Sequence, residues 1–297
     1  MEFTLQAVHL IRARLADYAV LVKFRLTLLV VFSSVFGYLL GAEAIQGSVL
    51  LLVVVGGLFV TFAANSMNQV LEKEYDRLMV RTQNRPLVTS KISVPEAVLF
   101  SGLSCLIGIT ALAAINAWAA LFGMISFLLY AFVYTPLKRI HPIAVLVGAI
   151  PGAMPVFIGW VSGTGYLAQE GLLLFSLQFF WQFPHFWAIA WLGHDDYSRA
   201  GFKMLPESSG QPTRETARQS LIYASMLVLL PVMMFAFGHT GWIGLIILVL
   251  LGLHYTRAGY LFYRGLDDGY ARRLLYASFL YLPIALIGLF VDQWILG

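Results

Sequence analysis

The sequence contains few charged residues and a single cysteine. Only 11% of its 297 residues are Asp, Glu, Lys or Arg, whereas 60% are hydrophobic and the mean hydropathy is +0.80. Such a composition excludes an ordinary soluble domain, which would expose too much apolar surface. Because Cys105 is alone and lies in an apolar run, neither an internal disulfide nor a cysteine-based metal site can form.

Apolar runs long enough to cross about 30 Å of hydrocarbon recur along the chain. They predict nine transmembrane helices, at about 18–41, 48–71, 93–114, 118–135, 142–162, 168–193, 217–238, 241–263 and 272–296. The runs are too long and too uniformly apolar for barrel strands, so the predicted fold class is all-α, a polytopic membrane protein. No low-complexity linker divides the chain, which predicts a single transmembrane domain over 1–297.

The first run follows a short lead that contains Arg12, Arg14 and Asp17. It lacks a small-residue cleavage site, so we expect a retained span and not a signal peptide. We expect the amphipathic lead itself to lie along the membrane surface.

Positive charge is absent from every second connecting segment. All 19 Lys and Arg lie in the lead or first run, or in the segments after the second, fourth, sixth and eighth runs and the run ends beside them. This alternation predicts a cytoplasmic amino terminus and an external carboxyl terminus. The net charge of +4 and the pI near 9.2 then reflect topology and contact with anionic lipid or substrate, and not nucleic-acid binding.

The two longest predicted cytoplasmic segments lie at about 72–92 and 194–216. They are four runs apart, and an even offset returns the chain to the same side of the membrane. This spacing favours two four-helix pseudo-repeats plus a ninth helix around a central cavity.

A polar stripe ends the second run. Asn68, Glu72 and Asp76 are spaced by four, so on a helix they drift by only about 40° per step and form a stripe about 12 Å long. Mg²⁺ prefers one or two carboxylates together with waters and substrate phosphate oxygens. Arg81 and Arg85 can take phosphate oxygens that the metal leaves free. The pattern indicates a magnesium and diphosphate site; a charged turn where a helix leaves the bilayer is the alternative.

A second acidic pair, Asp195 and Asp196, follows the sixth run. The predicted topology places it on the same side of the membrane as the stripe, where two metals could hold one diphosphate. A charge pair that ends a helix explains the two residues equally well.

Polar residues also occur inside the aromatic runs. Gln182 and His185 are three apart in the sixth run, beside Trp181. A buried ionisable residue in a membrane is a functional candidate, so His185 is a candidate metal-centre ligand or substrate donor; a structural histidine bonded to a neighbouring helix is the alternative.

The fourth run closes with two tyrosines and two basic residues, namely Tyr130, Tyr134, Lys138 and Arg139. The tyrosines share a helix face, and the basic residues would lie at headgroup level. A substrate site and an aromatic belt with positive-inside anchors account for the four about equally well.

Together these constellations resemble the intramembrane UbiA-type prenyltransferases. The first family motif is Asn-x-x-x-Asp-x-x-x-Asp, which appears here as Asn68, Glu72 and Asp76, with Glu in place of the middle Asp. The continuation from Arg81 to Arg85 and a following Pro-Leu is also typical. Closer similarity to the branch that acts on heme lies in residues 134–139, 152–160 and 181–206. Residues 23–25 resemble the family's Lys-Pro-Arg, with Phe at the middle position.

The second acidic motif departs from the quinone-type pattern. Those members carry Asp-x-x-x-Asp, whereas this chain has adjacent Asp195 and Asp196, with Ala200 where a further Asp would fall. This departure favours the heme branch. The resemblance covers about residues 20–290.

The resemblance implies that the substrates are farnesyl diphosphate and heme b, and that the products are heme O and diphosphate. It implies Mg²⁺ as cofactor, held by Asn68, Glu72, Asp76, Asp195 and Asp196. The implied phosphate-binding residues are Arg81, Arg85, Lys138 and Arg139. The implied residues for the heme or the prenyl chain are His185, Gln182, Tyr130, Tyr134 and Trp181. The expected location is the cytoplasmic membrane of a bacterium.

Two other functions stay open from the residues. A UbiA-type enzyme could act on an aromatic quinone precursor, and a transporter could bind an anionic substrate in the same polar patch. No sequence feature identifies a protein partner, which leaves open a membrane enzyme of heme metabolism or a second copy of the chain.

Overall fold

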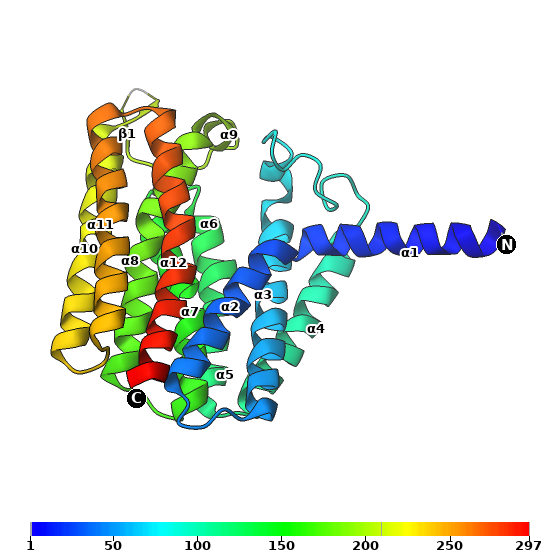
Figure 1. Cartoon of the computed structure of the whole chain (residues 1–297). Coiled ribbons are helices and arrows are strands. Elements are labelled where there is room, and N and C mark those ends of the chain that lie inside the picture. The colour runs from blue at the N-terminus through cyan, green and yellow to red at the C-terminus, as the bar shows by residue number, and fades with distance from the viewer. Residues whose placement is uncertain (1, 209, 297) are drawn as a thin grey trace.

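The computed structural model describes residues 2–208 and 210–296, and most of them lie in helices (Figure 1). The helices are α1 (Glu2–Leu21), α2 (Phe24–Gly41), α3 (Gly47–Asp76), α4 (Val94–Ala113), α5 (Ala117–Leu128), the π-helix η1 (Leu129–Tyr134), α6 (Thr135–Leu137), α7 (Ala144–Thr164), α8 (Gln169–Leu192), α9 (His194–Arg199), α10 (Arg214–Ala236), α11 (Trp242–Gly265) and α12 (Asp268–Leu296). Strands β1 (Glu207–Ser208) and β2 (Gln211–Pro212) form one short antiparallel hairpin. The predicted all-α class is confirmed.

Eight helices in the described ranges are long and apolar enough to cross a membrane: α2, α3, α4, the continuous stretch Ala117–Leu137, α7, α10, α11 and α12. Helices suit this setting because each backbone N–H finds its acceptor within the same segment. The chain is therefore an integral, multi-pass membrane protein.

The expected sixth span corresponds to α8, which is not among these eight although it has 24 residues. Gln178, Gln182 and His185 lie along it and lower its mean hydropathy. The same polar residues that single out this helix for function thus weaken its hydrophobic signal. The number nine stays a prediction.

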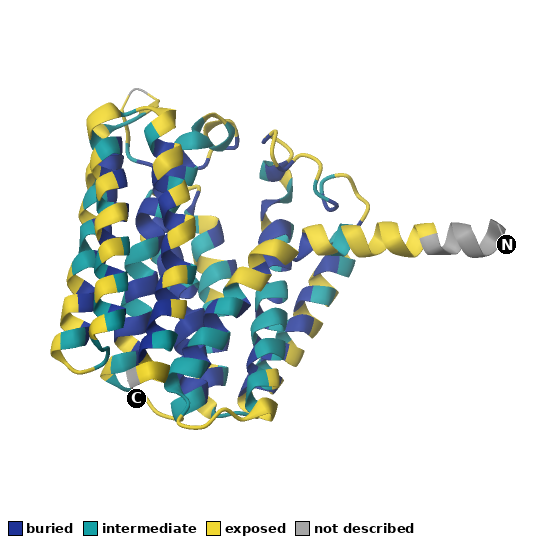
Figure 2. Ribbon diagram, in the orientation of Figure 1, coloured by how far each residue is buried: buried dark blue, intermediate teal, exposed yellow. Residues whose placement is uncertain are grey.

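The long helices run side by side in one bundle with α7 and α8 inside it (Figures 1 and 2). α7 packs along α2 and α8, α8 along α10 and α12, and α12 returns to α2, which closes the ring. In its most apolar stretch 78% of α7 is buried, far more than in any other of the eight candidate spans.

Small residues allow α2 and α7 to approach closely. A Cβ atom at Gly159 would lie 1.8 Å from the backbone oxygen of Ser34. Only glycine fits at this crossing, as expected for helices that associate through backbone contact in lipid.

The first predicted run is split in the structure. α1 ends at Leu21, and Lys23 has φ 49°, a left-handed conformation, before α2 begins at Phe24. A helix does not continue through a non-glycine residue in that region. The expectation of one helix over 18–41 was therefore wrong at its start, and the break turns Lys23 toward the interior.

α1 runs across the direction of the long helices and away from the bundle (Figure 1). Its apolar side chains Leu10, Ile11 and Leu15 are exposed. The helix is attached to α4 by Glu96, which accepts from Tyr18 at 2.5 Å and pairs with Arg14. This course supports the expectation that the lead lies along the membrane surface, because the exposed apolar side chains would then enter lipid.

Cysteine labelling tests the predicted orientation. In a Cys105→Ser background, Asn84→Cys and Glu207→Cys should react with a membrane-impermeant maleimide only from the cytoplasmic face, and Tyr166→Cys only from the external face. All three positions are exposed. The Cys105→Ser protein without an added cysteine is the unlabelled control. Labelling of residues 84 and 207 from opposite faces would contradict the shared cytoplasmic surface.

Candidate functional site

The polar stripe of α3 is buried inside the bundle. Asn68 and Asp76 are each 1% exposed and Glu72 is 5% exposed. They occupy the last turns of α3, where the four-residue spacing keeps them on one face. Two carboxylates removed from water in this way require compensating positive charge.

Each member of the stripe receives one basic side chain. Lys23 Nζ donates to Asn68 Oδ1 at 2.9 Å, Lys138 pairs with Glu72, and Arg85 Nη1 lies 2.5 Å from Asp76 Oδ2. The three cations come from three different segments: the α1–α2 turn, the end of α6 and the loop after α3. The stripe therefore gathers distant parts of the chain around itself.

The donors suit a hard cation. Asp76 Oδ1 is buried and accepts no hydrogen bond in the described part of the chain, while Oδ2 of the same carboxylate is held by Arg85. Amide and carboxylate oxygens are the ligands that Mg²⁺ prefers, and substrate phosphates usually complete its shell. An unpartnered buried carboxylate oxygen beside two other oxygen donors thus fits Mg²⁺.

The fourth run contributes its tyrosines through an irregular segment. Tyr130 and Tyr134 lie in η1, with ring centroids 5.4 Å apart. Thr135 donates to Tyr130 O and accepts from Asn68 Nδ2 at 3.1 Å, which orients the amide oxygen toward Lys23. Wide turns of this kind often occur at functional sites.

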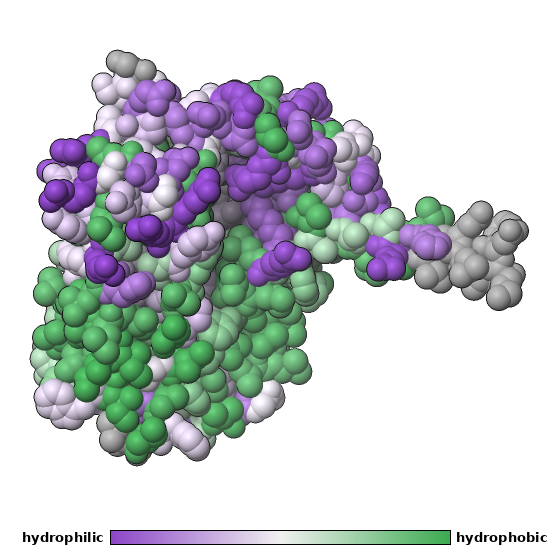
Figure 3. Space-filling model, turned by 45° about the horizontal axis from the view of Figure 1, so that its top comes forward, coloured by the Kyte–Doolittle hydropathy of each residue, from purple (hydrophilic) through white to green (hydrophobic). Residues whose placement is uncertain are grey.

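These residues line one cavity of about 300 Å³ at the polar end of the bundle. The predicted residues that line it are Asn68, Glu72, Asp76, Arg81, Arg85, Tyr130, Tyr134, Lys138 and His185. Figure 3 shows a hollow with hydrophilic walls at this end, above a broad apolar band. The structure thus brings these predicted residues, from several helices, to the wall of one cavity.

A second, apolar cavity of about 100 Å³ adjoins the first, and Leu26 and Tyr130 line both. Its other walls are mostly aliphatic and come from α2, α3, α4, α5 and α7, for example Val30, Val60 and Ile158. A charged cavity and an apolar cavity therefore share part of one wall.

His185 reaches the cavity from α8. Its ring stacks on Trp181 at 4.9 Å, and Nδ1 lies 2.8 Å from Ser278 Oγ on α12. Phe186 and Phe279 contact the ring at their edges. The histidine is thus fixed by a neighbouring helix, as in the structural alternative, and also faces the site.

Three predicted residues do not line the cavity. Trp181 supports His185 and donates from Nε1 to the backbone oxygen of Ser278. Gln182 donates to Ala149 O on α7. Its Oε1 also lies against Gly152 of α7, since an added Cβ atom there would lie only 1.9 Å from it. Gln182 therefore joins α8 to α7. The Arg139 guanidinium lies 4.1 Å from the ring centre of Tyr75.

The second acidic pair is also outside the cavity walls. α8 stops at Leu192 and α9 begins after Gly193, so His185 and Asp196 do not lie on one continuous helix face. Asp195 lines a separate pocket with His194. Asp196 accepts from the backbone N–H groups of Val80 and Arg81 and pairs with Arg199.

Asp196 thereby anchors the loop that carries Arg81 and Arg85. Partial burial acts to raise its pKa, but the two N–H donors and Arg199 stabilise the carboxylate more strongly, so the pKa is lowered. A lowered folded-state pKa means that this anchor is present at neutral pH and is lost only in acid.

Lys23, Thr135 and Ser278 are the site residues that sequence reasoning did not select. Lys23 was visible only as part of a family-like motif, because its inward turn depends on the break before α2. Thr135 was visible only as part of the family-like stretch 134–139, and Ser278 carries no sequence signal, since their roles depend on contacts with Asn68 and His185 from other helices.

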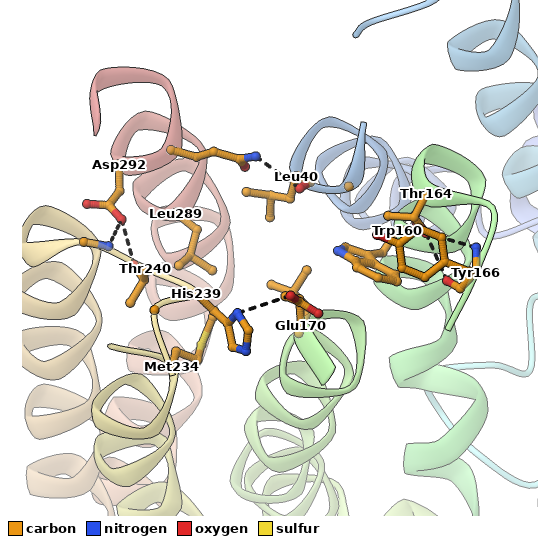
Figure 4. Close-up of a pocket in the computed structure, with 15 residues that line it drawn as sticks. Leu40, Trp160, Thr164, Tyr166, Glu170, Met234, His239, Thr240, Leu289 and Asp292 are labelled. Atoms are coloured by element: carbon orange, nitrogen blue, oxygen red, sulfur yellow. Dashed lines mark hydrogen bonds and ion pairs between the residues drawn. The ribbon is translucent and has the colours of Figure 1, made fainter. Parts of the chain in front are cut away.

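A larger cavity in the described structure, of about 510 Å³, lies elsewhere, near the carboxyl end of α12 (Figure 4). His239 Nδ1 lies 3.3 Å from Glu170 there, and Asp292 accepts from Thr240 at 2.8 Å. No Lys or Arg lines it. A site for a multiply charged anion needs positive charge, so chemistry favours the smaller cavity over the larger one.

The chain is similar to known proteins over most of its length. Residues 30–287 match the UbiA prenyltransferase family. The chain is 41% identical over 286 residues to a protoheme IX farnesyltransferase of Christiangramia forsetii, covering 95% of this chain and 94% of that protein.

Solved structures share the fold. A digeranylgeranylglyceryl phosphate synthase superposes with a TM-score of 0.79 at 19% identity, covering 94% of this chain and 98% of that one. A UbiA homologue from Archaeoglobus fulgidus bound to GPP and Mg²⁺ gives 0.67 at 17% identity, covering 92% and 99%. At these identities the likeness concerns the fold alone.

The loop anchor can be tested without any substrate. Asp196→Ala should speed amide hydrogen exchange in residues 77–93 by about 10-fold or more, because two N–H groups lose their acceptor. Asp195→Ala is the matched control and should leave exchange in that loop unchanged. Equal exchange in both variants would show that Asp196 does not hold the loop.

Proposed function

The chain belongs to the UbiA prenyltransferase family, and from that premise we propose that it transfers the farnesyl group of farnesyl diphosphate to a vinyl group of heme b. Water adds in the same reaction, so the products are heme O and diphosphate. The observation that carries the proposal is a pair of cavities that share Leu26 and Tyr130 in their walls, one charged and lined by a histidine, the other apolar. The name of the Christiangramia relative supports this choice of substrates.

The charged cavity binds the diphosphate. Arg81, Arg85, Lys138 and Lys23 line it, and all four come from segments outside the helix that carries the acids. Guanidinium groups hold phosphate oxygens in pairs, while the lysines act as compact charges. Arg139, which is also a predicted phosphate-binding residue, stacks on Tyr75 and is not among the residues that line this cavity.

Asn68, Glu72 and Asp76 would hold Mg²⁺, in line with the Archaeoglobus homologue solved with GPP and Mg²⁺. The ion supplies positive charge that stabilises the departing diphosphate. Lys138 and Arg85 pair with the two carboxylates, and Lys23 donates to the neutral amide of Asn68. The same basic residues are then available for phosphate when the acids take the metal. Asp195 and Asp196 stay the predicted second ligand pair, and Asp196 would have to release Val80 and Arg81 first.

The apolar cavity takes the first part of the farnesyl chain, since it begins at Leu26 and Tyr130, beside the charged groups. Its aliphatic walls exclude water from the allylic carbon. The rest of the chain can lie between helices toward lipid. A substrate with a charged head and an apolar tail matches this arrangement in polarity along its whole length.

The reaction breaks the bond between the allylic carbon and the diphosphate oxygen, and the electron pair leaves with diphosphate. The Lys138 ammonium lies 4.9 Å from the ring centre of Tyr134, which indicates that the Tyr134 ring already faces positive charge. Tyr130 and Tyr134 would stabilise the allylic cation through their π systems. The vinyl group of heme then bonds to that carbon. Water adds to the resulting cation and loses a proton, which leaves the hydroxyl group of heme O.

His185 is the proposed contact to heme, because it lines the cavity together with the acids and with the apolar residues Phe186 and Ile189. Trp181 supports the His185 ring, and Gln182 supports the contact between α7 and α8. The active face is proposed to be cytoplasmic, in the membrane of a bacterium, because the site lies at the hydrophilic end of the bundle (Figure 3) and Arg81, Arg85 and Lys138 line it.

Two alternatives remain testable. A quinone precursor would use the same diphosphate site with a different acceptor. A transporter would place its charged site near the bilayer midplane, whereas here the acids occupy the last turns of α3 at one end of the bundle. The terminal position favours an enzyme that receives its charged substrate from one side.

Product identity distinguishes these functions. Purified protein in lipid discs, supplied with Mg²⁺, farnesyl diphosphate and heme b, should release diphosphate and form heme O, as measured by chromatography and mass spectrometry of extracted porphyrins. Parallel reactions contain an aromatic quinone precursor in place of heme. Prenylation of that acceptor alone, or release of no diphosphate at all, would contradict the proposed function.

A charge-neutral substitution tests the stripe. Asp76→Asn keeps the side-chain shape but removes the charge, so turnover should fall by roughly 100-fold or more while the folded protein persists. Glu74→Gln is the matched control, because Glu74 is on the same helix but 66% exposed and paired only with Arg77. Near-normal turnover by Asp76→Asn at ordinary Mg²⁺ would remove Asp76 from the metal site.

A further inference from the structure

The hydrogen bond between His185 and Ser278 decides which ring nitrogen of His185 faces the cavity. Ser278 is fully buried on α12, and its Oγ lies 2.8 Å from His185 Nδ1. A neutral imidazole carries one proton, on either Nδ1 or Nε2. The partner of one nitrogen therefore determines the state of the other.

The proton of Ser278 is already committed. Its Oγ lies 2.5 Å from the backbone oxygen of Leu275, a distance at which two oxygens must share a hydrogen. A serine hydroxyl has a single proton and two lone pairs. If Ser278 gave that proton to His185 instead, two oxygen lone pairs would face each other at the Leu275 contact. Ser278 therefore accepts from His185, and Nδ1 carries the ring proton.

Nε2 of His185 is then the nitrogen with the free lone pair. In the described part of the chain no protein group hydrogen-bonds to Nε2, and the residue forms part of the cavity wall. The ring has little freedom to turn, because Trp181 stacks on it and Trp181 is itself bonded to the Ser278 backbone. Tyr255 donates to Trp181 O at 3.2 Å and fixes that turn of α8.

We propose that Ser278 is a positioning residue that holds His185 as the Nδ1–H tautomer, so that Nε2 ligates the iron of the heme substrate. The iron belongs to the acceptor, so this inference rests on the proposed function. When the ring nitrogen that does not bind the metal donates a hydrogen bond, that bond orients the imidazole and raises its basicity. Loss of such a hydrogen bond typically weakens metal binding by about 10- to 100-fold. Ligation at one fixed nitrogen would hold the porphyrin in one position relative to the allylic carbon.

The tautomer can be measured on the full-length protein without heme. Long-range ¹H–¹⁵N correlation spectra of ¹⁵N-histidine-labelled protein distinguish protonated from unprotonated ring nitrogens, and His185→Ala identifies the signals of His185. We expect a protonated Nδ1 and an unprotonated Nε2. A protonated Nε2 in the unsubstituted protein would overturn the proposal, however the Ser278 variants behave.

Heme titration tests the consequence. Ser278→Ala should lower ferric heme affinity by about 10-fold and weaken the absorption and spin-resonance signature of a nitrogen ligand. Ser278→Thr keeps the hydroxyl and should retain both. Ser220→Ala is the matched control, because Ser220 is equally buried and also donates back along its own helix, to Thr216 O at 2.8 Å, yet contacts no histidine. Binding of farnesyl diphosphate with Mg²⁺ should be unchanged in all three.

Imidazole rescue separates ligation from packing. His185→Ala should lose the nitrogen signature, and added imidazole should restore it together with part of the heme O formation.

Heme O formation by the unsubstituted protein, combined with no nitrogen signature, would overturn the inference and leave the proposed function standing. Failure to form heme O would refute the function, while the tautomer measurement would still stand. An unchanged tautomer and heme affinity in Ser278→Ala would show that Ser278 only packs.

Discussion

Asn68, Glu72 and Asp76 are held inside a membrane protein, and two of them are carboxylates that cannot stay charged there without partners. This requirement organises the polar end of the bundle. Lys23 reaches the stripe because the chain breaks in a left-handed turn before α2, Lys138 because α6 ends beside it, and Arg85 because the loop after α3 folds back. Three segments far apart in sequence thus share one electrostatic partner.

The proposed chemistry uses the same balance of charge. Two carboxylates and four basic residues line the charged cavity, so its basic side chains exceed its acids and can offset the negative charge of a diphosphate. The apolar cavity directly behind Tyr130 then keeps water from the reactive carbon. Ionisation of an allylic diphosphate requires charged groups already in place around the diphosphate and an apolar, water-free environment for the carbon that it leaves.

The helical architecture could be predicted because spans in lipid must satisfy their own backbone hydrogen bonds. The ranges expected for α3, α4, α7 and α10 agree with the structure within a few residues at most ends. The error at the first span has a physical cause, because the left-handed Lys23 makes the helix begin later than expected. The expected sixth span agrees with α8, whose hydrophobic signal is weakened by Gln178, Gln182 and His185.

The membrane class, the polar stripe and the basic residues near it follow from the amino-acid sequence alone, because they depend on composition and on a fixed helical period. Which candidate residues line the same cavity depends on the tertiary structure. His185 enters the cavity, but Asp196 binds the backbone of the loop after α3, since Gly193 separates two helices. Lys23, Thr135 and Ser278 acquire roles solely through contacts between helices. Such contacts depend on how several segments pack at once, which no local pattern in the sequence records.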